Sequence, residues 1–190
     1  ERILIHSNGY ASTPAFNVEF LISGLSNQSG LKYLGLLDSE ENIESLDLSK
    51  LTQLDDIWLS SSVLTSLDLS NNVNLKSIIL SLNSANSLNF SNNINLKELS
   101  ISGSSLTSIN MTKNNLLEDL IITGTLINNL DLSQCSSLIN VDIENNNQLV
   151  NINLANSNNQ SINIFDASSN SSLNCIQIDE NFSPPSPVFN

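Results

Sequence analysis

The chain has 190 residues, of which 39% are hydrophobic and only 13% are charged. Nineteen acidic and six basic residues give it a net charge of −13. That charge argues against nucleic-acid binding, because such binding rests on neutralising phosphates with Lys and Arg. No apolar run approaches the roughly 18 residues of a transmembrane helix, so we predict no transmembrane segment. The sequence starts without Met or a signal sequence, and we expect a processed chain or an excised fragment.

Residues 1–30 are predicted to form an N-terminal cap. Apolar residues recur at helical spacing between Pro14 and Gly24. Thr13 would cap this short helix, Pro14 would be its first residue and Gly24 would end it. The helix would cover the open edge of the first repeat, and residues 1–7 are expected to add a strand.

Two short apolar phrases recur between residues 31 and 143, mostly 21 residues apart, and the spacing slips after Ile143. The period is about 21 residues, and a fixed period of this size is the signature of a solenoid. The first phrase is centred on the pairs Leu46/Leu48, Leu67/Leu69, Leu88/Phe90, Ile109/Met111 and Leu130/Leu132. The second phrase is centred on the pairs Leu34/Leu36, Ile57/Leu59, Ile78/Leu80, Leu99/Ile101, Leu120/Ile122 and Val141/Ile143.

Apolar and variable residues alternate in both phrases, which predicts two short strands per coil. We call them the first strand, of the 67–69 type, and the second strand, of the 78–80 type. Equivalent strands of stacked coils would lie in parallel about 4.8 Å apart. The predicted fold is therefore all-β, a repeat solenoid with two narrow parallel sheets over residues 31–180. A proline-rich C-terminal linker is expected over residues 181–190.

Asparagine recurs three positions after the first strand. The column consists of Asn72, Asn93, Asn114 and Cys135 and, after a shift in spacing, Asn170. At a tight turn, Asn side chains can hydrogen-bond buried backbone groups that would otherwise lack partners. We therefore predict a structural ladder along this corner of the coils.

The pattern L-x-x-L-x-L-x-x-N/C over residues 31–180 resembles the leucine-rich repeat, in a form with two strands per repeat. The segment after residue 147, with Phe165–Asp179, is similar to the end of secreted leucine-rich repeat proteins of Bacteroidota, particularly flavobacteria. The resemblance implies a secreted or cell-surface protein, on the exterior of the outer membrane. Such repeats host many different partners, so the fold alone does not name one.

Two cysteines are too few for a disulfide framework. Cys135 occupies a ladder position, which favours a buried structural thiol. A disulfide between Cys135 and Cys175 is the alternative, but the two lie more than one coil apart, and a disulfide needs Cα atoms within about 7 Å.

The first strand presents nearly uniform columns of Ser and of Asp or Asn, the latter comprising Asp47, Asp68, Asn89, Asn110 and Asp131. The favoured interpretation is a polar ladder that satisfies turn groups and faces water. Calcium binding by stacked carboxylates and ice binding by a hydroxyl array are weaker alternatives, because Asn interrupts the acidic column and regular Thr is absent. We predict neither a metal nor a cofactor.

The second strand presents variable residues on a constant frame, which is the pattern of a recognition surface. The candidate binding residues are Tyr33, Asp56, Trp58, Ile79, Glu98, Ile121 and Asp142. Trp58 is the only tryptophan and would lie between Gly35 and Ile79, as in an interaction hot spot. In the alternative, the N-terminal cap folds over Trp58 and buries it.

No catalytic motif accompanies these faces, and the only histidine, His6, lies outside the repeats. We therefore expect a non-enzymatic module for protein binding or adhesion at the cell surface. Carbohydrate binding on a Trp58 platform, with Asp56 and Ser77 accepting hydroxyl hydrogens, is one alternative. A structural accessory subunit of an outer-membrane complex is another.

Overall fold

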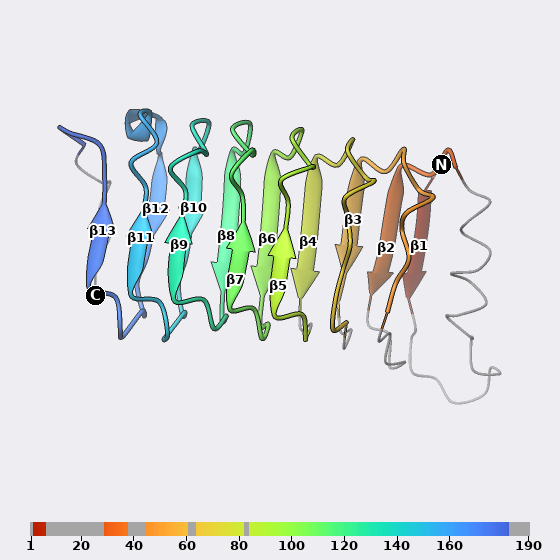
Figure 1. The fold of residues 1–190 in the computed structure, drawn as a ribbon, viewed down its shortest axis with the longest axis horizontal. Coiled ribbons are helices and arrows are strands. Elements are labelled where there is room, and N and C mark those ends of the chain that lie inside the picture. The colour runs from red at the N-terminus through yellow and green to blue at the C-terminus, as the bar shows by residue number, and fades with distance from the viewer. Residues whose placement is uncertain (1, 7–28, 38–44, 61–63, 82–83, 183–190) are drawn as a thin grey trace.

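The computed structural model describes residues 2–6, 29–37, 45–60, 64–81 and 84–182. These residues form a parallel β-solenoid in which each turn of the chain stacks on the one before it (Figure 1). The predicted helix between Thr13 and Gly24 lies outside the described residues, as does most of the predicted linker.

The second strands form one continuous parallel sheet. It contains eight strands in the order β1-β2-β3-β4-β6-β8-β10-β12. Their bounds are β1 Arg2–His6, β2 Tyr33–Leu37, β3 Asp56–Leu59, β4 Ser77–Ser81, β6 Glu98–Ser102, β8 Asp119–Thr123, β10 Asn140–Asp142 and β12 Ile164–Asp166. The strand expected in residues 1–7 is thus β1, which pairs with β2 at the N-terminal end of the sheet.

The first strands are less regular than predicted. They form a two-stranded sheet of β5 (Ser87–Asn89) and β7 (Ser108–Asn110), and a three-stranded sheet of β9 (Asn129–Asp131), β11 (Asn151–Asn153) and β13 (Cys175–Gln177). Residues 46–48 and 67–69 follow the same path without regular strand pairing. The prediction of a single sheet on this side was therefore wrong, because regular pairing is lacking before β5 and between β7 and β9.

The core fills the space between the two sides with Leu and Ile. In β4 and β8 the burial alternates residue by residue, so that Ile78, Leu80, Leu120 and Ile122 point inward. Each of these four side chains has at most 2% of its surface exposed. Because every coil supplies the same inward positions, the core runs along the whole axis instead of forming a single centre.

The corner after the second strand needs a left-handed backbone. Gly103 and Gly124 have φ of 58° and 63°, and the matching residues of the next coils, Asn145 and Ser169, have φ of 61° and 57°. The coils also approach closely there, since a Cβ on Gly124 would lie 3.4 Å from the backbone nitrogen of Gly103. Glycine meets both demands at little cost.

The last coils depart from the regular period, as the sequence predicted. One turn of the chain separates Val141 from its register partner Phe165, and one turn separates Asn129 from its partner Asn151. Both turns contain more residues than the turn from Leu120 to its partner Val141. The inserted residues include a single 3-10 turn, η1 (Asn159–Ser161).

Candidate functional site

A row of buried asparagines holds successive coils together after the first strand. Asn93 is typical, because its Nδ2 donates to the carbonyl oxygens of Leu69 and Asn72, at 3.0 and 2.9 Å. Asn72 and Asn114 repeat this arrangement one coil earlier and one coil later. All three side chains are fully buried, so each bond satisfies a carbonyl that water cannot reach.

Cys135 continues this row without the amide's bonds. Its Sγ lies 4.0 Å from the carbonyl oxygen of Met111, and both it and Cys175 are free thiols. Burial, and secondarily the nearby Asp131, raises the pKa of the Cys135 thiol to about 12, so it stays protonated at neutral pH. Cys175, by contrast, is exposed near the end of the solenoid.

Sequence reasoning misplaced the residue that follows Cys135 in the row. Asn156 takes this position, because its Nδ2 donates to the Cys135 carbonyl at 2.8 Å. Asn170 lies at the opposite corner instead, where it donates to the carbonyls of Ile143 and Ala167. It follows Asn146, whose Nδ2 donates to the Ile122 carbonyl at 2.7 Å. The chain therefore has a second ladder, and the regular repeat spacing counted on from Cys135 would have identified Asn156.

The polar column of the first strands is engaged with its own backbone. Oδ1 of Asp47, Asp68, Asn89, Asn110 and Asp131 each accepts the backbone N–H two positions further on. Side-chain and backbone hydrogen bonds from Ser49 and Ser70 lower the pKa of Asp47 and Asp68. This turn accepts either an acid or an amide, which explains why the two alternate in the column.

The second-strand face, meaning the outward side chains of the eight-stranded sheet, carries an exposed apolar row. Register pairs Gly35 with Trp58 and Trp58 with Ile79, on neighbouring strands. Trp58 is 39% exposed and Ile121, further along the same row, is 41% exposed. A glycine on one side of Trp58 leaves the indole without a tall neighbour there.

A shallow depression surrounds Trp58. Its lining residues are Lys32, Tyr33, Asp56, Ile57, Trp58, Ser77 and Ile79. All of them except Lys32 belong to β2, β3 or β4, so the depression is built on strands rather than on a loop. It brings Tyr33, Asp56, Trp58 and Ile79 of the predicted site together. The other predicted residues, Glu98, Ile121 and Asp142, lie on later strands.

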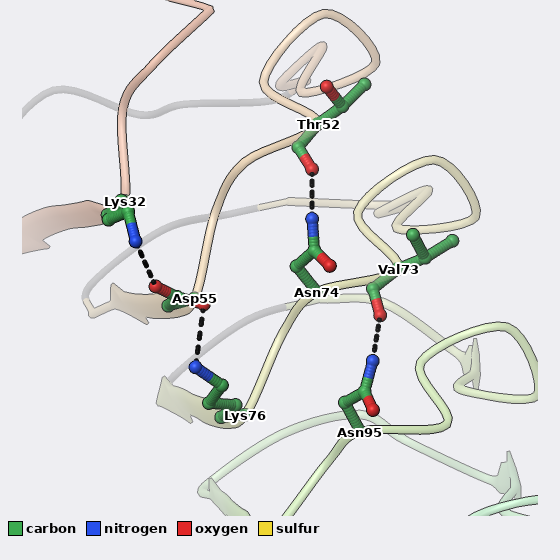
Figure 2. A network of polar contacts seen from close by, with 7 residues as sticks. All are labelled: Lys32, Thr52, Asp55, Val73, Asn74, Lys76 and Asn95. Carbon is green, nitrogen blue, oxygen red and sulfur yellow. Dashed lines mark hydrogen bonds and ion pairs between the residues drawn. The ribbon is translucent and has the colours of Figure 1, made fainter.

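Charged side chains stack across the coils just before the second strands. Asp55 lies between Lys32 and Lys76, with N–O distances of 3.4 and 3.1 Å (Figure 2). The hydrogen bond from Lys76 is the main reason that the pKa of the Asp55 carboxyl is lowered. Close by, exposed asparagines link the turns, since Asn74 donates to the Thr52 carbonyl and Asn95 to the Val73 carbonyl (Figure 2). Both lysines are exposed, so each ion pair with Asp55 adds little stability by itself.

Further along the face, carboxylates are held by neutral donors. Glu98 accepts a hydrogen bond from Ser77 Oγ at 2.8 Å, and Asp119 accepts one from Asn140 Nδ2. Asp142 accepts the backbone N–H of Glu144 at 3.2 Å. Among the described residues, no three metal-ligating side chains cluster, and no helix is long and apolar enough to cross a membrane.

Comparison with known proteins supports the fold. A scan against protein-family models found no match, and neither did a search of curated proteins. Among solved structures, the chain is similar to the functional domain of InlJ from Listeria monocytogenes, which includes a cysteine ladder. The two share 18% identity with a TM-score of 0.52, over 82% of this chain and 50% of that one. This chain therefore spans about half the length of that structure.

InlJ is a leucine-rich repeat protein. At this level of identity the similarity concerns the fold alone, and the chain has a leucine-rich-repeat-like parallel β-solenoid with about 21 residues per turn.

Proposed function

We propose that this chain is a non-enzymatic binding module that recognises a protein partner through its second-strand face. The observation that carries the proposal is the pair of exposed apolar side chains, Trp58 and Ile121, on a continuous sheet, with the half-buried Ile79 beside Trp58. Large apolar side chains in such a position act as anchors for protein contacts. Rigidity of the sheet helps, because the anchors lose little freedom when a partner docks.

The proposal places the module outside the cell, as a secreted or cell-surface protein that works in adhesion or as part of an outer-membrane complex. The Ser- and Asn-rich surface and the resemblance of the C-terminal segment to secreted Bacteroidota proteins support this location.

Affinity capture from surface extracts of the producing cell tests the proposal. The double variant Trp58→Ala/Ile79→Ser removes the anchors, and the control Ile94→Ser/Leu116→Ser removes apolar groups at the turn edge that are at least as exposed as Trp58. We expect wild type and the turn-edge variant to capture the same protein and the Trp58 variant to lose it. Equal capture by all three would contradict a site on this face.

Carbohydrate binding is the second candidate, because Asp56 and Ser77 line the same depression as the exposed indole. Trp58 is the only tryptophan, so its fluorescence reports this site alone. Quenching by oligosaccharides from the same surface extracts, absent with non-cognate sugars, would favour this function. Loss of capture without any quenching would favour the protein partner.

A further inference from the structure

Charge is distributed unevenly along the second-strand face. Around β2–β4, Lys32 and Lys76 flank Asp55. Beyond Lys97, the only basic residue in the sequence is Lys113, which lies in the turn before β8 and not on this face. The acidic outward residues of this part are Glu98, Asp119, Asp142, Glu144 and Asp166.

The negative charge of this part is not neutralised by the protein itself. Lys97 pairs with Glu118 at 2.6 Å, so its positive charge compensates that of Glu118 and not those of the other acids. The donors to Asp119 and Asp142 are an amide and a backbone N–H, and Asp166 likewise accepts the backbone N–H of Ser168 at 2.8 Å. Neutral donors orient the carboxylates but leave their charge in place for a partner.

Apolar anchors and acids lie in one line across the strands. Register connects Trp58 to Ile79, then Ser100, Ile121, Asp142 and Asp166. With neighbouring strands about 4.8 Å apart, the five steps from Trp58 to Asp166 span about 24 Å. An extended chain covers that length with about seven residues.

From this arrangement we infer that the second-strand face docks a short basic segment of a protein partner along the solenoid axis. Apolar side chains of the segment contact Trp58 and Ile79, and its Lys or Arg side chains meet Asp119, Asp142 and Asp166. The inference rests on the proposed function and adds the chemistry and direction of the partner. Charge complementarity selects a basic segment, since an acidic one would face uncompensated carboxylates.

A library of random twelve-residue peptides displayed on phage tests the inference with the intact chain as bait. We expect enriched peptides to carry large apolar residues in one half and several Lys or Arg residues in the other. Neutralising the acids with Asp119→Asn/Asp142→Asn/Asp166→Asn should weaken binding of these peptides about tenfold, since three charge pairs at this half-exposed row are lost.

A matched control is available on the opposite face. Asp47→Asn/Asp68→Asn/Asp131→Asn removes the same charge, and Asn89 and Asn110 already fill this turn position in the native chain. We expect this variant to bind the peptides as wild type does, with the melting temperatures of both variants near that of wild type.

The outcomes separate the inference from the proposed function. The inference would be overturned, and the proposed function left standing, if the enriched peptides lacked a basic half. The same holds if binding survived neutralisation of Asp119, Asp142 and Asp166. A library that yields no peptide sensitive to Trp58→Ala/Ile79→Ser would also overturn the inference, whereas the proposed function is overturned when capture from surface extracts is insensitive to that variant. Equal weakening by both triple variants would reduce the effect to net charge and would also overturn the inference.

Discussion

The two faces of the solenoid use their polar residues differently. On the first-strand face, Asp47, Asp68 and their equivalents accept hydrogen bonds from their own turn, and the identities hardly change from coil to coil. On the second-strand face, Asp142 and Asp166 make the same turn bond, but the outward residues range from Gly35 to Trp58 and Glu98 on a constant backbone. Uniform columns therefore serve the fold, and variable columns are available for recognition.

Two neighbouring positions in β6, one inward and one outward, should give the largest difference in stability. Leu99 is completely buried, and Leu99→Asp would place an unpaired charge in the core. We expect a loss of more than about 4 kcal/mol in the free energy of unfolding. Ser100→Asp, at the next position and facing outward, should change it by less than about 0.5 kcal/mol. Urea denaturation measures both, and a similar loss for the two variants would contradict the register.

The ladder that supports the first-strand side gives a second test. Asn93→Ala would leave the carbonyls of Leu69 and Asn72 without donors, and we expect a loss of about 2–4 kcal/mol. Its neighbour Asn92 donates to the Ser70 carbonyl at the exposed surface, so Asn92→Ala should cost less than about 1 kcal/mol. Thermal melts of the two variants would show equal shifts only if burial did not matter at this corner.

In the coil of Gly124, the opposite corner depends on a left-handed backbone conformation, and the asparagine bonds of that corner begin only with Asn146 in the next coil. Gly124→Ala forces a Cβ onto a residue with φ of 63°, against the backbone of Gly103. We expect a loss of about 1 kcal/mol, measured by urea denaturation. Gly30→Ala is the control, because nothing lies within 4 Å of its added Cβ. A larger loss of stability for Gly30→Ala than for Gly124→Ala would show that backbone conformation and close stacking at Gly124 are not important for stability.

The smallest effect concerns the acids of the first-strand face. Hydrogen bonds from Ser49 and Ser70 hold the pKa of Asp47 and Asp68 below the ordinary 3.8 in the folded chain. The unfolded chain therefore binds protons first on acidification. Their stabilising contribution is complete above pH 3.8 and is lost as the pH falls through the lower folded values.

We expect Asp47→Asn/Asp68→Asn to reduce the acid dependence of the urea midpoint below that pH. At neutral pH the midpoint should fall only slightly, because an amide oxygen accepts the same turn hydrogen bonds. An acid dependence identical to wild type would contradict the role of these turns.

The fold could be predicted from sequence because every coil repeats the same inward Leu and Ile positions, and their constant period sets the stacking. The candidate face followed from the alternation within β3 and β4, which fixes the outward side of Trp58 and Ile79. The break in the first-strand sheet could not be predicted, because the residues around Leu67 carry the same pattern as β5.

Asn170 was assigned to the wrong ladder for a related reason. Insertions after Ile143 lengthen one side of the coil more than the other, and the pattern around Asn170 does not say which corner it reaches. Only the pairing of Val141 with Phe165 settles this. The excess of acidic residues after Lys97 is visible in the sequence. Their position next to Ile121 on one face follows only from the register of the strands.

The asparagine ladder also has a mechanical consequence. Each rung, such as Asn114 donating to the carbonyls of Phe90 and Asn93, ties a coil only to the coil before it. A force applied along the axis would therefore detach coils one after another, starting from an end. Since a coil contains about 21 residues, each detachment would release about 70 Å of extended chain. Pulled between two surfaces, the solenoid would lengthen in steps and absorb work at each one.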